Sequence, residues 1–152
     1  VYIATRLEHA SNVRRIIQTL AEDYNVGVTY DWTAHGSVQA EGPQRIAEVA
    51  AAETLGVRTA DLVVVLLPGG RGTHAELGIA LGAGRKVAIY GDTRDHDGRE
   101  CAFYYGKGVV HTDVCDPFMD HGRTAAKIAA QTWRLWAQRP RGGVAGGPCS
   151  VN

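Results

Sequence analysis

Glu76 ends the glycine-rich stretch PGGRGTHAE, at the point where a loop gives way to a predicted helix. Gly69, Gly70 and Gly72 lack side chains, so the backbone of this loop can approach a ligand closely. A carboxylate in the first turn of a helix is favoured in its ionised form, which suits a nucleophile. A structural interpretation is equally open, because Thr73 and Glu76 have the spacing of a capping box, in which Thr73 caps the helix and Glu76 bonds back to the Thr73 amide.

A second carboxylate, Glu53, is predicted to face the protein interior. At about 100° per residue it shares a helix face with the apolar Ile46 and Ala50, whereas Glu48 falls on the opposite side. A carboxylate aimed at a core is costly unless it is paired or lines a cavity, and two converging acids are what glycosidic-bond cleavage requires. Tyr2, at the end of the first predicted strand, could donate a hydrogen bond to either acid. The structural alternatives are a helix face rotated slightly from this estimate and an ordinary strand tyrosine.

The segments that would position these residues alternate between strand and helix patterns. Apolar or alternating runs predict strands at 1–4, 26–32, 62–67, 86–90 and 108–112, and apolar residues at helical spacing predict helices at 13–20, 43–57, 73–83 and 122–137. Such alternation is typical of a parallel sheet with right-handed crossovers. We therefore expect a three-layer α/β fold whose five-stranded, Rossmann- or flavodoxin-like parallel sheet has the order 2-1-3-4-5.

In such a sheet, ligands bind beyond the carboxyl ends of the strands at the point where the winding reverses. That point lies between the first and third predicted strands, so the segments after Ile3 and Leu67 should lie side by side. We expect one domain over residues 1–139, followed by a flexible tail rich in Gly and Pro at 140–152.

Three segments, VYIATR, ETLGVRTADLVVVLL and GTHAELGIALGAGRKVAIY, resemble the nucleoside 2-deoxyribosyltransferase family, which includes the 2'-deoxynucleoside 5'-monophosphate N-hydrolases. The resemblance covers residues 1–90, and its most specific element is the pattern G-[ST]-x-x-E-[LI]-G-x-A, matched here by Gly72, Thr73, Glu76, Leu77, Gly78 and Ala80.

The resemblance implies a catalytic role for the two acids and the tyrosine. Glu76 would attack the sugar as a nucleophile and form a glycosyl-enzyme intermediate, and Tyr2 falls on the family's active-site tyrosine. Glu53 falls on a position that the family usually fills with Asp, where it would help to bind the sugar and to protonate the leaving base. The proposed chemistry needs neither a cofactor nor a metal.

The sequence departs from the family in ways that bear on the substrate. Glu53 is one methylene longer than the usual Asp, and Gly70 aligns with a phosphate-binding Ser of the nucleotide hydrolases. Thr5 and Arg6 could still bind a 5'-phosphate, and Asp92 could bind the base or sugar. The residues expected to bind substrate are therefore Thr5, Arg6, Gly69, Gly70, Gly72, Thr73 and Asp92.

The family's transferases also use groups near the chain's end that a neighbouring subunit supplies. The resemblance therefore implies a homodimer or a higher homo-oligomer, although the Gly-rich tail carries no match to those groups. PGGRGTHAE also matches the PGGxGTxxE motif of the cytokinin-activating phosphoribohydrolases, which cleave the N-glycosidic bond of a nucleoside 5'-monophosphate. The continuation ELGIALGAGRKV favours the deoxyribosyltransferases.

Composition excludes several other classes. The chain of 152 residues has 16 basic and 16 acidic residues, so no basic field draws it to nucleic acid or to an anionic membrane. The glycine loop lacks the Lys-Ser/Thr of a Walker A motif and opens the third unit of the sheet, which excludes a dinucleotide fingerprint as well. Three widely spaced cysteines predict neither disulfides nor a zinc site, and they favour the cytoplasm.

The sequence thus predicts an enzyme that cleaves the N-glycosidic bond of a nucleoside or its 5'-monophosphate and transfers the sugar to another base or to water. A nucleotide-sensing module that binds a ligand without turnover is the non-enzymatic alternative. Neither the base, the sugar nor the need for a phosphate can be predicted from these residues.

Overall fold

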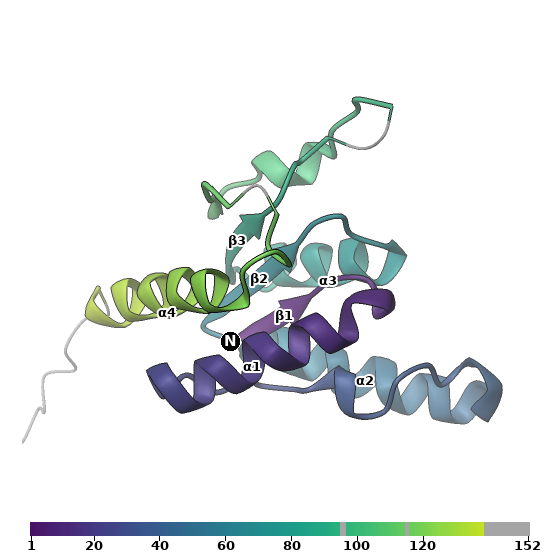
Figure 1. Ribbon diagram of the computed structural model, residues 1–152. Helices are drawn as coiled ribbons and strands as arrows, with labels where there is room; N and C mark the ends of the chain where they lie inside the picture. The colour runs from purple at the N-terminus through teal and green to yellow at the C-terminus, as the bar shows by residue number, and fades with distance from the viewer. Residues whose placement is uncertain (95–96, 115, 139–152) are drawn as a thin grey trace, which may run out of the picture.

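The computed structural model describes residues 1–94, 97–114 and 116–138, and it contains a four-stranded parallel sheet in the order β1-β2-β3-β4 (Figure 1). The predicted tail at 140–152 lies outside the described residues. The strands are β1 (Tyr2–Ala4), β2 (Leu62–Leu66), β3 (Lys86–Tyr90) and β4 (Val109–His111). All five side chains of β2 are buried, as expected of a central strand that helices cover on both faces.

Four α-helices complete the three layers. They are α1 (Ala10–Tyr24), α2 (Pro43–Thr59), α3 (Arg71–Gly82) and α4 (His121–Ala137). Helices α1 and α4 pack together on one face of the sheet, and α2 and α3 pack together on the other (Figure 1). The predicted α/β class and parallel sheet are therefore confirmed.

The predicted strand at 26–32 is wrong, and with it the five-stranded order 2-1-3-4-5. The segment lies beside β1, where the Thr29 amide donates to the Val1 carbonyl at 2.8 Å, but within the described residues it forms no strand. The Trp32 indole donates a hydrogen bond to the Ile3 carbonyl at 2.7 Å. The Asp31 carboxylate accepts a hydrogen bond from the Thr33 amide at 3.0 Å and so caps a short 3₁₀ helix. Isolated backbone hydrogen bonds and the Trp32 indole, rather than a second ladder, thus satisfy this edge.

The carboxyl ends of β1 and β2 meet, as the sequence predicts. The two strands pair in register from Tyr2 opposite Val63 to Ala4 opposite Val65. Beyond the pairing, the Thr5 hydroxyl donates to the Leu66 carbonyl at 2.8 Å. The segments that follow the two strands are thereby joined at the edge of the sheet where a ligand is expected.

A close contact at Gly56 lets α2 lie against Tyr2. A methyl group built at Gly56 would come within 2.7 Å of the Tyr30 Cβ and 3.1 Å of the Tyr2 ring. The Tyr2 side chain is completely buried. The missing side chain at Gly56 therefore leaves room for a tyrosine whose hydroxyl reaches the candidate site.

We predict that Gly56→Ala destabilises the protein even though alanine is the better helix former by about 1 kcal/mol. Overpacking against Tyr2 and Tyr30 should lower the free energy of unfolding by roughly 1–3 kcal/mol, measured by urea denaturation. The matched control is Gly78→Ala on α3, where no atom lies within 4 Å of the added methyl group. That variant should be as stable as the wild type or slightly more stable, and an equal gain in both variants would refute the close contact.

Candidate active site

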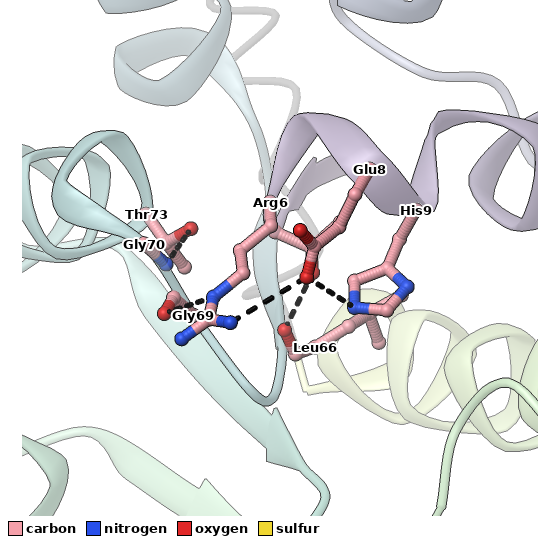
Figure 2. Close-up of polar contacts among 8 residues, drawn as sticks. Arg6, Glu8, His9, Leu66, Gly69, Gly70 and Thr73 are labelled. Carbon is pink, nitrogen blue, oxygen red and sulfur yellow. Dashed lines mark hydrogen bonds and ion pairs between the residues drawn. The ribbon is translucent and has the colours of Figure 1, made fainter. Parts of the chain in front are cut away.

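Glu76 turns away from its own helix and toward β1. Its side chain is only 9% exposed, and the Tyr2 hydroxyl donates a hydrogen bond to its Oε1. The capping-box interpretation is wrong, because α3 begins at Arg71 with Gly70 as its N-cap. The Thr73 hydroxyl instead accepts a hydrogen bond from the Gly70 amide at 3.0 Å (Figure 2), and Glu76 is left for the interior.

Burial dominates the electrostatics of Glu76. Loss of solvent raises the pKa of its carboxyl from the ordinary 4.5 to about 8; the hydrogen bond from Tyr2 opposes this rise, and the negative charge of Glu53 adds to it. The partial positive charge of the helix N-terminus would favour the ionised carboxylate, but it does not offset this rise, because Glu76 lies in the second turn of α3. Burial, followed by the charge of Glu76, raises the pKa of Tyr2 well above its usual range, so the phenol remains a donor.

A cavity of about 520 Å³ opens beside the two carboxylates. We call it the carboxylate cavity. Its walls come from the ends of β1 and α3, from the inner side of α2 and from the segment at 32–39. Of the residues predicted from the sequence, those that line it are Thr5, Arg6, Glu53, Gly70, Gly72, Thr73 and Glu76.

Glu53 reaches the carboxylate cavity from α2. Its side chain is half-buried, and desolvation raises the pKa of its carboxyl while the charge of His35 lowers it. Because the charge of Glu53 raises the pKa of Glu76, the two acids interact across the cavity. The structure therefore brings Tyr2, Glu53 and Glu76 together, from a strand and two helices that are distant in the sequence.

Arg6 lies over the glycine loop at the mouth of this cavity. Its Nε donates to the Gly69 carbonyl at 2.8 Å, and its Nη1 lies 3.4 Å from the Glu8 carboxylate (Figure 2). The Thr5 hydroxyl donates its hydrogen bond to the Leu66 carbonyl, so it can only accept a hydrogen bond from a ligand. Arg6 and the exposed Arg71 line this cavity together with Glu8, whose carboxylate balances the charge of Arg6.

Gly69 and Asp92 lie apart from the two carboxylates. Both line a second cavity of about 690 Å³, on the other side of Arg6. Asp92 is held at the surface by Arg94, whose Nε and Nη2 lie 3.1 and 3.2 Å from its carboxylate, and these hydrogen bonds keep the pKa of Asp92 below its usual range. The structure thus does not place Asp92 beside the acids.

Two cavity residues were missed by sequence reasoning. Trp32 and His35 both line the carboxylate cavity. Trp32 is buried, and its indole donates a hydrogen bond to the Ile3 carbonyl. The alternating pattern predicts a strand for the first, and the second follows it in a predicted loop. The sequence carried one usable signal, namely that the pair His35-Gly36 lies shortly after Trp32, where the alternating segment ends.

Within residues 1–94, 97–114 and 116–138, no group of three or more His, Cys, Asp or Glu side chains is arranged to hold a metal ion. In the same part of the chain, no helix is both long and apolar enough to cross a membrane.

Comparison with known proteins identifies a family. A family model described as nucleoside 2-deoxyribosyltransferase matches residues 1–113, which confirms the resemblance seen in the sequence and extends it beyond residue 90. Neither a curated protein sequence nor a solved structure matches the chain.

Glu76→Gln should stabilise the protein, and increasingly so as the pH rises. The carboxyl has a pKa of about 8 when folded and close to 4.5 when unfolded, so between these values only the unfolded state ionises and the wild type loses stability. The loss is about 1.4 kcal/mol per pH unit at most. In urea denaturation at pH 5, 7 and 9, the difference in the free energy of unfolding between the variant and the wild type should grow with pH up to about pH 8. Glu48→Gln, the same change on the exposed side of α2, is the control, and parallel curves for Glu76→Gln would contradict the burial argument.

Proposed function

Because the chain belongs to the nucleoside 2-deoxyribosyltransferase family, we propose that it cleaves the N-glycosidic bond of a (deoxy)nucleoside or its 5'-monophosphate and transfers the sugar to another base or to water. The observation that carries this proposal is the buried Glu76 carboxyl, which receives a hydrogen bond from Tyr2 and shares a cavity with Glu53. A retaining glycosidase needs such a pair, one acid to attack the sugar and one to handle the proton.

Before the first step the proton that the buried Glu76 carboxyl holds must pass to Glu53, and the Glu76 carboxylate then attacks C1' of the sugar. The bond between C1' and the base nitrogen breaks, its electron pair goes to the base, and the base takes a proton from the Glu53 carboxyl. The products are a free base, a Glu76 glycosyl ester and an ionised Glu53. Tyr2 supports this step because its hydroxyl holds the Glu76 carboxylate in place and donates to the charged form.

The second step reverses the first with a new partner. Water or an acceptor base gives its proton to Glu53 and attacks C1', and the electron pair of the ester bond returns to Glu76. The configuration at C1' is retained after two inversions. The pair of acids then again holds one proton, as it did before the reaction.

Two arginines and the carboxylate of Glu8 line the mouth of the cavity, and a negatively charged substrate group would bind through the arginines. Arg6 and Arg71 line it near the start of α3, and the Arg71 side chain is exposed. A 5'-phosphate would be attracted to these guanidinium groups, and Arg71 could bind its oxygens in a bidentate manner, whereas Arg6 already donates to Gly69 and Glu8. A phosphoribohydrolase of the cytokinin-activating type would use the same mouth, and a sensing module would bind there without turnover.

We predict that Glu76→Gln abolishes base release while ligand binding is largely kept. The amide can accept the Tyr2 hydrogen bond but cannot form the ester. The assay is chromatography after incubation with a panel of ribo- and deoxynucleosides and their 5'-monophosphates, with and without an acceptor base, with binding followed by calorimetry. Release from monophosphates alone would favour a hydrolase, and exchange that requires an acceptor would favour a transferase. Full turnover by the variant would contradict the proposal.

The pH profile should report the shared proton of the two acids. The active form holds one proton between Glu76 and Glu53, so kcat/KM should fall as the pH rises through about 8, where the pair loses that proton. In Glu53→Gln, the small residual activity should instead rise with pH to a plateau, because only ionised Glu76 is then required. An increase of wild-type kcat/KM through pH 8 would show that Glu53 does not supply the proton.

A further inference from the structure

A third cavity, of about 430 Å³, lies between α4 and the starts of β2, β3 and β4. We call it the edge cavity, because β4 is the edge strand of the sheet. Leu62 and Lys86, the first residues of β2 and β3, line it, whereas the carboxylate cavity lies beyond the carboxyl ends of the strands. The two cavities share no lining residue, so the edge cavity is separate from the candidate active site. Its volume is within the range of roughly 300–1,000 Å³ that holds small ligands.

The edge cavity has an apolar floor. The register of the strands puts Leu62 and Val110 on the same face of the sheet, opposite the face of Tyr2. Leu135 of α4 adds a further apolar side chain to the lining. Val110 is 48% exposed, which is high for a valine of a parallel sheet. A ligand with a flat, apolar body would therefore remove hydrophobic surface from water at this place.

The ionised side chains that line the edge cavity are cations. Lys86 and Arg134 are both exposed, and no Asp or Glu is among the described residues that line the cavity. Within the part of the chain that the structure describes, neither side chain makes a hydrogen bond or an ion pair. Asp61, just before β2, does not line the cavity, and its carboxylate accepts a hydrogen bond from the Trp136 indole at 3.0 Å. Both cations are thus available to an anionic ligand.

An unpaired amide completes the lining. Gln131 lies one turn before Arg134 on the same side of α4, and its Oε1 is buried without a hydrogen-bond partner among the described residues. A buried polar atom without a partner is costly and calls for an explanation. Rotation about the last side-chain bond exchanges the oxygen with the NH₂ group, so the amide can turn either one toward a ligand. An amide that both donates and accepts matches the edge of a nucleobase.

We propose that the edge cavity is a second, non-catalytic binding site for a nucleoside 5'-monophosphate. The phosphate binds Lys86 and Arg134, and the base lies on the apolar floor with one edge toward Gln131. Two cations without a neighbouring carboxylate suit a phosphate dianion, and the guanidinium group can bind two of its oxygens. The described lining holds no acid that could attack the sugar or protonate the base, so the nucleotide is bound there without cleavage.

Binding is tested in the Glu76→Gln variant, so that no nucleotide is consumed. Amide NMR spectra are recorded with the 5'-monophosphates of adenosine, guanosine, cytidine and thymidine, with the four nucleosides, and with inorganic phosphate. At millimolar concentration at least one nucleotide should shift the backbone amides of Gly108 and Val110 and the side-chain amide of Gln131 in a saturable manner. The matching nucleoside and inorganic phosphate should each bind about 10-fold more weakly or less, because each lacks one half of the contacts.

Three variants test the contacts one by one. Lys86→Gln and Arg134→Gln should each weaken nucleotide binding at these amides by roughly 10-fold, the effect of losing a hydrogen bond to a charged group. Arg58→Gln is the matched control, because Arg58 is also an exposed cation in the last turn of a helix but lies outside the edge cavity. Gln131→Leu should weaken binding and yet raise the melting temperature of the unliganded protein, because it removes the unpaired amide.

Three results would overturn the proposal. The first is that no nucleotide shifts the amides of the edge cavity, and the second is that inorganic phosphate binds there as tightly as the nucleotides. The third is that these amides shift with protein concentration alone, which would assign the cavity to a second copy of the chain. The proposal does not rest on the proposed function, since binding is measured without turnover. A failure to release any base would refute the function and leave this test unchanged, and circular dichroism of each variant excludes misfolding.

Discussion

The hydrogen bond from Tyr2 to Glu76 is the interaction on which the rest of this structure depends. It places a carboxyl group in the interior, where an ionised acid is costly and a neutral one needs a partner. The partner is available only because β1 pairs with β2 in register and α3 starts just beyond β2. The glycine at position 56 then lets α2 close over the tyrosine ring. The strand pairing, the glycine loop and the contact of α2 with Tyr2 thus together position the Tyr2 hydroxyl and the Glu76 carboxyl.

The same burial sets the chemistry. Desolvation raises the pKa of Glu76 into the neutral range, and the neighbouring Glu53 pushes it further. A buried acid that retains its proton weakens the fold at alkaline pH. Strongly perturbed pKa values of this kind are commonest at functional sites. The burial that costs stability therefore keeps a proton on this carboxyl at neutral pH. The segment at 32–39 forms one wall of the cavity beside these acids.

Several features could be predicted from the sequence because they depend on local pattern. The helix beginning at Pro43, the strand at 86–90 and the meeting of the first and central strands all follow from apolar periodicity and turn residues. The alternation at 26–32 predicted a strand, and Val26 and Trp32 at its two ends are buried. The strand does not form, because hydrogen bonds such as that from Trp32 to Ile3 replace the ladder, and alternation alone cannot reveal which partner a carbonyl takes.

The sequence by itself determined the α/β class, the glycine loop before α3 and the family, since these are written in periodicity and short motifs. Only the tertiary structure decided where Glu76 points, because T-x-x-E spacing serves a helix cap and an inward acid equally well. It also separated Asp92 from the two acids and brought His35 to their cavity. Those outcomes depend on packing between segments far apart in the chain, and residue spacing carries no record of such packing.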